Sequence, residues 1–300
     1  MVQSTLIEPA APAVYQNATL GATEITLPQK ERRRALLVPR EHGAWGMLLI
    51  PLATGAAVGM LGRGHLGPVL LLTAAVLALF WLKTPVESWL GTGTLRVQTA
   101  QERALVRAVI LPLAVISVAS LCGLFWQGNN RSLACLGAIA GSAFGAQVFL
   151  KRMGRTMRMA AEVVGALALT TTAPAAYCVA AGRLDAKAWT LRLLNWLFAA
   201  DQIHFVWIRI RGARAGAWGQ KLALGWTFLA GNILLGATLA LACYFKWLPQ
   251  AAPIAFLPIL FRGLAWFARK SQPLNVRHLG WTEMVHALVF ATLLIAAFAF

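Results

Sequence analysis

Nine apolar stretches, most of them long enough to cross a bilayer as a helix, follow one another along this 300-residue chain. A transmembrane helix needs about 20 predominantly apolar residues. Only 12% of the residues are charged, against roughly 25% in an average soluble domain. Short segments of alternating polarity, which membrane β-strands need, do not occur. We therefore expect an all-α, polytopic membrane protein with about nine transmembrane helices, near residues 44–61, 67–90, 105–126, 132–150, 160–182, 188–208, 220–245, 250–268 and 280–300.

The basic residues are distributed unequally between the two ends of these predicted helices. Of 27 Lys and Arg residues, 21 fall on the side of the N-terminal tail. Cytoplasmic loops carry the excess of Lys and Arg in membrane proteins, which predicts a cytosolic N-terminus in the inner, cytoplasmic membrane. The six on the other side are Arg63, Arg131, Arg183, Lys187, Arg192 and Lys246.

The formal net charge of +17 follows mainly from this topology, and no nucleic-acid-binding module accompanies it, so nucleic acid is not an expected partner. Residues 1–40 lack the apolar centre of a secretory signal, and we expect them to form a disordered basic tail in the cytosol. A single transmembrane helical domain should follow at residues 41–300. The run Lys30–Arg34 should lie against the membrane, with anionic lipid headgroups as partners.

Small residues and prolines inside the predicted spans indicate how the helices pack. Gly55 and Gly59, like Gly137 and Gly141, have the spacing that permits close approach of two helices. Each proline in a span removes a backbone hydrogen bond, which produces an ordinary kink or a bend around a cavity. These prolines are Pro51, Pro112, Pro174 and Pro258.

Carboxylates are the strongest indication of a functional site. Asp201 lies eight residues before Arg209, so a rise of about 1.5 Å per residue places it roughly 12 Å below the cytosolic helix end. A short ionisable side chain at that depth usually faces a partner or a water-filled cavity, and a functional site is the default hypothesis. A buried structural hydrogen bond or ion pair is the alternative.

Two carboxylate–histidine pairs share a three-residue spacing. His204 follows Asp201, and His286 follows Glu283 in the last span, so each pair lies on one helical face. We interpret these four residues as candidate catalytic groups for acid–base chemistry. Such pairs can hold a metal when their helices face one another, but metal sites of this kind need more carboxylates, so the metal is unknown and a hydrogen-bonded polar seam is favoured.

Basic residues beside this seam could bind an anionic group. Arg presents a planar bidentate fork to phosphate oxygens and Lys a compact charge. Most basic residues near the helix ends serve as membrane anchors, but some adjoin polar runs that enter a span. Our candidates for substrate binding are Arg40, His42, Lys151 and Arg209.

The segments Pro39–Met47, Pro-Arg-Glu-His-Gly-Ala-Trp-Gly-Met, and His278–His286, His-Leu-Gly-Trp-Thr-Glu-Met-Val-His, resemble the YwiC-like family of bacterial membrane proteins. The resemblance covers the chain from about residue 38 to its C-terminus. It implies a multi-pass membrane protein and leaves the biochemical role undefined.

A more distant resemblance is to the UbiA superfamily of prenyltransferases, nine-helix bundles that bind a prenyl diphosphate through Mg²⁺ held by two Asp-rich motifs. Gln147 to Arg152 is similar to that family's Tyr-Pro-x-x-Lys-Arg segment, with Gln147 in place of Tyr. Residues 91–103 contain no Asp, and Asp201 to His204 supplies one carboxylate. Because Mg²⁺ prefers oxygen ligands, this loss weakens the case for Mg²⁺ and for ordinary diphosphate chemistry.

Three functions follow from these observations. The first is a divergent UbiA-like transferase acting on a lipid or prenyl substrate at the cytosolic leaflet. The second is a proton-coupled transporter of a small solute, in which intramembrane carboxylates carry the proton. The third is a non-catalytic lipid-binding or assembly protein. The sequence does not decide whether the chain is an enzyme, what its oligomeric state is, or whether Asp201 and Glu283 share one site.

Overall fold

The computed structural model describes residues 28–39, 42–62, 64–91, 95–128, 130–215, 217–269 and 274–300. Helices dominate these residues, and no strand occurs among them. The α-helices are α1 (Gln29–Leu37), α2 (His42–Met60), α3 (Leu66–Leu90), α4 (Ala100–Trp126), α5 (Asn130–Arg152), α6 (Arg158–Leu169), α7 (Thr172–Ala181), α8 (Ala186–Arg211), α9 (Trp218–Tyr244), α10 (Leu257–Ala268) and α11 (Val276–Ala299). Three 3₁₀ helices accompany them, η2 (Arg155–Met157), η3 (Gly212–Arg214) and η4 (Ala252–Phe256).

Every predicted span corresponds to a helical segment, which confirms the all-α, polytopic class. Seven segments are long and apolar enough to cross a membrane, with α6 and α7 together forming one of them. The other two predicted spans are α8, whose 26 residues are long enough but less apolar, and the 17-residue segment of η4 and α10. The lower apolarity of α8 reflects its polar residues, which include Asp201 and His204 of the predicted site.

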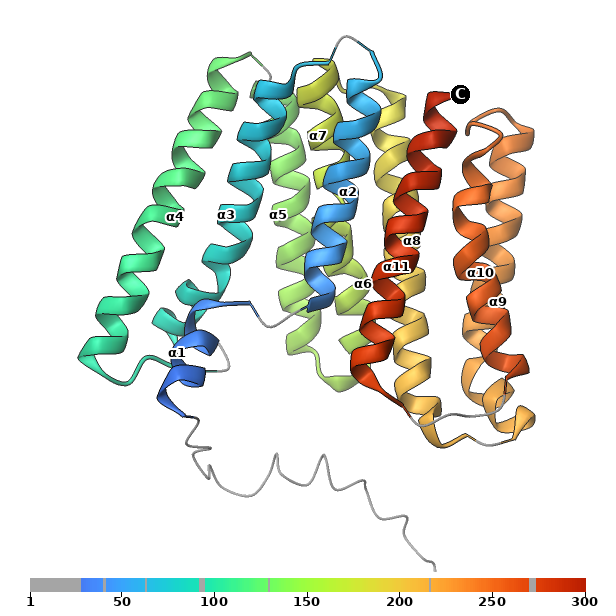
Figure 1. Cartoon of the computed structure of the whole chain (residues 1–300). Helices are drawn as coiled ribbons and strands as arrows, with labels where there is room; N and C mark the ends of the chain where they lie inside the picture. The colour runs from blue at the N-terminus through green and yellow to red at the C-terminus, as the bar shows by residue number, and fades with distance from the viewer. Residues whose placement is uncertain are drawn as a thin grey trace, which may run out of the picture.

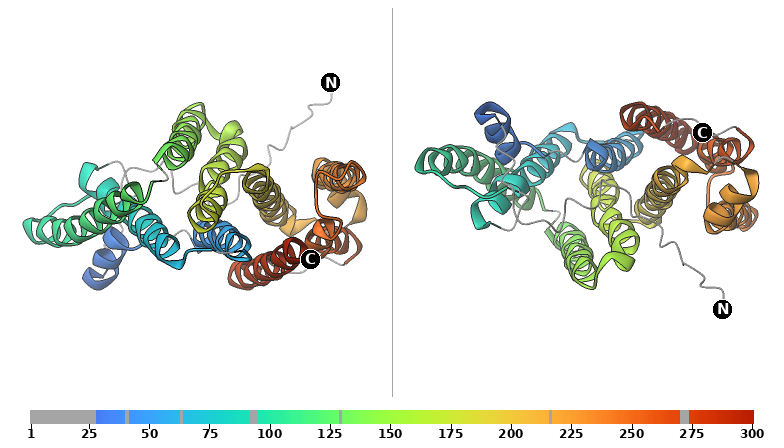
Figure 2. Two further views of the ribbon diagram at one scale, coloured as in Figure 1. Left: turned by 90° about the horizontal axis from the view of Figure 1, so that it is seen from above. Right: turned by 90° about the horizontal axis from the view of Figure 1, so that it is seen from below.

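The segments alternate in direction, so helix ends gather at two ends of the bundle (Figure 1). We call the end where α1 lies the α1 end and the other the opposite end, where the C-terminus lies. Seen along the helices, the bundle is elongated: α3 and α4 lie at one side, and α9 and α10 at the other (Figure 2). Between them, α2 packs against α7 and α11, and α8 packs against α2, α7 and α9.

Glycines bring α2 and α7 into close contact. A Cβ atom at Gly55 would overlap the carbonyl group of Ala173, and one at Gly59 would lie 2.7 Å from the Cβ atom of Ala180. The predicted role of Gly55 and Gly59 in packing is therefore confirmed. The same prediction is wrong for Gly137 and Gly141, because nothing among the described residues lies within 4 Å of a Cβ atom at either position. Their helix, α5, is mostly exposed.

The span of α6 and α7 is interrupted at Thr170 and Thr171. Pro174 follows and cannot donate a backbone hydrogen bond, which weakens the continuous helix at this point. Threonine hydroxyls compensate, since those of Thr170 and Thr171 donate to the carbonyl of Leu167. Pro51 and Pro112 lie inside α2 and α4, whereas Pro258 lies in the first turn of α10, where a proline costs no helical hydrogen bond.

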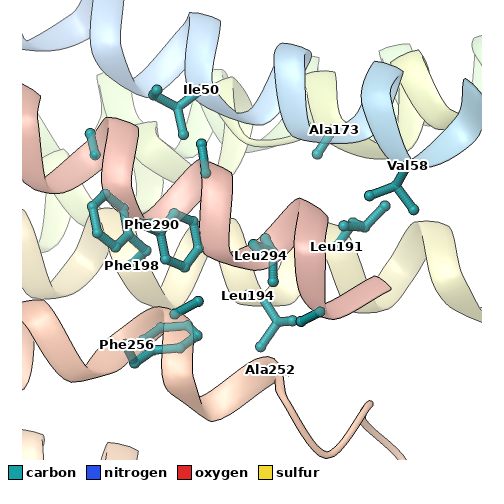
Figure 3. Packing of buried hydrophobic residues seen from close by; sticks show 14 of the residues in the cluster. Ile50, Val58, Ala173, Leu191, Leu194, Phe198, Ala252, Phe256, Phe290 and Leu294 are labelled. Atoms are coloured by element: carbon teal, nitrogen blue, oxygen red, sulfur yellow. The ribbon is translucent and has the colours of Figure 1, made fainter. Parts of the chain in front are cut away.

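An aromatic layer joins α8, η4 and α11 inside the bundle (Figure 3). The rings of Phe198 and Phe290 are stacked with centroids 4.0 Å apart, and Phe256 meets Phe290 edge-on at 5.2 Å. All three side chains are buried. Following the helix directions, this layer lies nearer to the opposite end than Asp201 and Glu283 do.

The tail differs in part from the prediction. Residues 1–27 lie outside the described residues, so disorder stays a prediction for them. Residues 29–37, which were predicted to be disordered, form helix α1. Leu36 is fully buried, and contacts with α3 and α4 supply the stabilisation that sequence composition alone did not indicate.

Candidate functional site

Three helices bring two carboxylates to one guanidinium inside the bundle. Arg262 of α10 donates through Nη2 to Asp201 Oδ2 of α8 at 2.6 Å. Through Nη1 it donates to Glu283 Oε2 of α11. We call Asp201, Arg262 and Glu283 the carboxylate–arginine cluster. The structure therefore places Asp201 and Glu283 in one site, the point that the sequence left open.

The cluster is buried and its charges do not balance. The exposed fractions of the side chains are 6% for Asp201, 8% for Arg262 and 11% for Glu283. The ring of Phe205 lies 4.0 Å from the guanidinium carbon and covers one of its faces. With all three groups ionised, the cluster carries one uncompensated negative charge in surroundings where such a charge is costly.

Two polar atoms of the cluster lack a partner among the described residues, Arg262 Nε and Glu283 Oε1. Buried polar atoms normally form hydrogen bonds, and exceptions often mark functional sites. Asp201 and Glu283 together offer more acceptor positions than their two hydrogen bonds with Arg262 use. The cluster can therefore accept at least one further hydrogen bond or bind a proton.

Neighbouring polar contacts fix the helices that carry the cluster. Gln202 of α8 donates to the backbone carbonyl of Glu283 at 3.0 Å, which ties α8 to α11. Lys221 of α9 is 2% exposed and donates to the carbonyls of Trp266 and Arg269 at the end of α10. A cation at this position satisfies the last carbonyls of the helix and complements its dipole. Lys221 thus helps to hold α10, and with it Arg262.

A small cavity lies between α2 and α8, and its lining includes Gln202, the residue after Asp201. Its volume is about 10 Å³, near the minimum that a single water molecule needs. Pro51 in its wall has no N–H group, so it leaves the carbonyl of Met47, another wall residue, without the usual helical donor. The lining residues are Gly46, Met47, Ile50, Pro51, Asn195, Phe198, Ala199 and Gln202.

This cavity touches the aromatic layer at Phe198. Gln202, on the α1 side of Phe198, contacts α11 at Glu283, while Asn195 lies on the other side of Phe198. Asn195 is 1% exposed and donates to the hydroxyl of Thr54 at 3.1 Å. Polar groups therefore continue along α8 on both sides of the layer.

A second, open hollow of about 390 Å³ lies at the opposite end. It is bordered by the start of α3 and the ends of α4 and α7, and its lining includes His65 and Gln127. None of the predicted site residues lines it.

The two predicted histidines have hydrogen-bond contacts outside the cluster, and His286 also interacts electrostatically with Glu283. His204 Nε2 lies 3.5 Å from the hydroxyl of Thr227, and its ring meets that of Phe228 on α9. His286 Nδ1 lies 2.7 Å from the carbonyl oxygen of Thr282 on its own helix. Their proposed roles in acid–base chemistry stay predictions.

Of the predicted anion-binding residues, Lys151 and Arg209 can be compared with the cluster, and neither contributes to it. Arg40 and the side chain of His42 lie outside the described residues. Lys151 is an exposed residue in the last turn of α5, and Arg209 occupies the last turn of α8. Both positions suit membrane anchors, so substrate binding by these residues stays a prediction.

Arg262 is the central residue that sequence reasoning missed. It was counted among the basic residues at a helix end, but it lies in the middle of α10 with its side chain buried. The signal available was its place within the predicted span at residues 250–268. An arginine inside an apolar span has the same claim to a partner as Asp201.

The residues present do not fit the Mg²⁺ site of the UbiA superfamily. Mg²⁺ is held by carboxylate oxygens with near-octahedral geometry. Here the guanidinium of Arg262 occupies the carboxylates of Asp201 and Glu283. Among the described residues, no group of three or more His, Cys, Asp and Glu side chains is placed to hold a metal ion.

Comparison with known proteins confirms the first resemblance. The family described as YwiC-like protein matches residues 38–177, which extend from the segment before α2 into α7. The match begins where the sequence indicated but ends before Asp201, Arg262 and Glu283. The curated proteins include no match to the chain. The distant resemblance to the UbiA superfamily stays a prediction.

Proposed function

We propose that this YwiC-like, multi-pass membrane protein is a proton-coupled transporter of a small solute, with the carboxylate–arginine cluster as its proton-binding site. The observation that carries the proposal is the sharing of one buried guanidinium by two buried carboxylates. The excess of basic residues at the α1 end supports a cytosolic orientation of that end in the inner membrane.

Charge balance supports the proton as the bound ion. Two carboxylates and one guanidinium have a net charge of −1, and a single proton on Asp201 or Glu283 makes the cluster neutral. Burying an unbalanced charge is costly, so the cluster with one proton is the favoured state in these surroundings. Glu283 Oε1, which lacks a partner among the described residues, offers a position for that proton.

Binding of the proton is linked to helix packing. Asp201, Arg262 and Glu283 come from α8, α10 and α11, so a change in their mutual attraction acts on three helices at once. A ligand shifts a conformational equilibrium by its different affinity for the two states. Loss of the proton would favour a conformation in which water or a solute reaches the remaining carboxylate.

The polar groups beside Phe198 support a route through the bundle. Phe198, Phe256 and Phe290 form an apolar layer that separates the cluster from the opposite end. Phe198 of this layer lines the cavity between α2 and α8, and so do Gln202 and Asn195, which lie on either side of Phe198 along α8. Hydrogen-bonding side chains in this position can relay a proton or contact a polar solute when the helices separate.

The transferase hypothesis receives less support from the same geometry. A prenyl diphosphate needs cations around its phosphates, but Arg262 is already bound to Asp201 and Glu283. The cavity between α2 and α8, at about 10 Å³, is far below the several hundred Å³ of a typical ligand pocket. A divergent transferase and a non-catalytic lipid-binding protein are therefore outcomes that the experiment must separate from transport.

Flux measurements test the proposal. Proteoliposomes containing the pH-sensitive dye pyranine would receive amino acids, sugars, polyols and organic acids one at a time. Coupled transport predicts a change of luminal pH with at least one solute class. Glu283→Gln should abolish this change, because the cluster would then hold no exchangeable proton.

The matched control is Glu162→Gln, which removes a carboxylate from a partly exposed pair with Arg158. It should keep the flux. A pH change that survives Glu283→Gln would contradict the role of the cluster. No pH change with any solute, together with a chemically altered lipid in the reconstituted membrane, would instead support a transferase.

A further inference from the structure

Helix α1 is held against the ends of α3 and α4 by one of its faces. Arg32 Nε donates to Glu102 Oε1 at 2.7 Å, and Arg32 Nη2 donates to the backbone carbonyl of Arg96. Trp81 Nε1 donates to the carbonyl of Leu37 at 2.8 Å. Together with the buried side chain of Leu36, these contacts fix which face of α1 points away from the bundle.

The other face of α1 is basic. Lys30, Arg33 and Arg34 are exposed, and Glu31 is the acidic residue of this helix. On α4, the exposed residue Arg103 follows the Glu102 that anchors α1. We call Lys30, Arg33, Arg34 and Arg103 the basic rim.

Exposed apolar side chains belong to the same end of α3. Leu90 is 67% exposed, and the indole rings of Trp81 and Trp89 are also exposed. The guanidinium of Arg107 stacks on Trp89 at 4.5 Å. Tryptophan at a helix end is typical of the membrane–water interface, so this part of the surface meets lipid.

We propose that the basic rim binds the headgroup phosphate of anionic phospholipid in the leaflet at the α1 end. A soluble anion would satisfy the charge but would leave the exposed Trp89 and Leu90 unmatched, whereas a phospholipid supplies a phosphate and apolar chains together. Basic residues near the cytoplasmic membrane surface are attracted to anionic lipid headgroups, and the outward face of α1 carries three of them. The inference does not depend on the proposed transport.

Lipid titration of the purified full-length protein in mild detergent tests this proposal. Dioleoyl phosphatidylglycerol should raise the melting temperature, because a ligand that binds the folded state stabilises it by mass action. Dioleoyl phosphatidylcholine and inorganic phosphate should have little effect. In Arg33→Glu/Arg34→Glu the apparent affinity for phosphatidylglycerol should fall by more than about tenfold, since each basic residue near an anionic surface contributes a several-fold factor.

The matched control is Arg131→Glu/Lys187→Glu, which changes the charge equally at exposed positions of the opposite end. It should keep the response to phosphatidylglycerol. The proposal is wrong if both double variants respond like the unmodified protein, or if inorganic phosphate stabilises it as strongly as the lipid. Should the Glu variant fail to fold, Arg33→Gln/Arg34→Gln and lipid retention in native mass spectrometry give the same comparison.

Discussion

Among the described residues, two largely buried clusters of arginine and carboxylate differ in how completely their charges and hydrogen bonds are paired. At the α1 end, Arg32 pairs with the single carboxylate of Glu102. The second carboxylate oxygen of Glu102 accepts from the backbone of Gln98 and Thr99, within a capping box at the start of α4. Inside the bundle, Arg262 is shared by Asp201 and Glu283, and two polar atoms lack a partner among the described residues.

This difference indicates that the Arg32–Glu102 pair is structural and that the carboxylate–arginine cluster is the candidate for function. The Arg32–Glu102 pair is neutral, and each group has several hydrogen bonds, so it stabilises α1 and the first turn of α4. The carboxylate–arginine cluster has a net charge of −1 when all its groups are ionised, and it has unused hydrogen-bond acceptor positions. Its charge therefore depends on whether a proton or another cation is bound. Substitutions in the two clusters should therefore have different effects.

The largest effect is expected from Arg262→Gln. It leaves two carboxylates buried together without a cation, and breaking a buried ion pair from one side typically costs about 3–5 kcal/mol. The melting temperature in detergent should fall strongly, and expression should decrease. Arg158→Gln, which breaks an exposed pair, is the control and should change stability by at most about 1 kcal/mol.

Combining Arg262→Gln with Asp201→Asn and Glu283→Gln should recover much of the lost stability, because no buried charge remains. A melting temperature of Arg262→Gln equal to that of the unmodified protein would show that the guanidinium does not compensate the carboxylates.

An intermediate effect is expected from Glu102→Gln. The variant loses the charge opposite Arg32 and weakens the capping box, each of which contributes roughly 1 kcal/mol. Thermal unfolding should show a moderate loss, with increased proteolysis within residues 29–37. Glu31→Gln on the exposed face of α1 should be close to neutral. If Glu102→Gln lost as much stability as Arg262→Gln, the two clusters would not differ in the way proposed.

The smallest effect on stability is expected from Asp201→Asn. The variant leaves Arg262 and Glu283 as a pair that is as neutral as the native cluster with its one proton, so the free energy of unfolding should change by less than about 1 kcal/mol. A moderate loss of stability in Glu102→Gln together with little change in Asp201→Asn would support the difference between the clusters. A large destabilisation by Asp201→Asn would indicate a structural ion pair instead.

The fold was predictable because the length and apolarity of a segment identify a transmembrane helix in the sequence. The predicted segment at residues 160–182 matches α6 and α7 closely, although the break at Thr170 depends on local threonine contacts that no hydropathy pattern contains. Gly137 shows the limit of motif reading. Its spacing resembles that of Gly55, but only the structure shows which helix face meets a neighbour.

The candidate site was predicted only in part. Depth in the span identified Asp201, and a shared spacing identified Glu283, yet their common partner was missed because an arginine in α10 was assigned to a helix end. Which helices meet is a property of tertiary packing, and α8 and α11 are separated by two other spans along the chain. Gln202 is a second example, since its contact with Glu283 joins residues 81 positions apart.

Infrared spectroscopy of the purified protein in mild detergent shows directly whether the carboxylate–arginine cluster holds one exchangeable proton. At neutral pH the exposed carboxylates are ionised, so the carbonyl stretch of a protonated carboxylic acid should come from the cluster alone. This band is expected in the unmodified protein and in Glu162→Gln, and it should be lost in both Asp201→Asn and Glu283→Gln, because either substitution leaves a neutral pair with Arg262. Absence of the band from the unmodified protein, or its persistence in both cluster variants, would show that the cluster does not hold this proton.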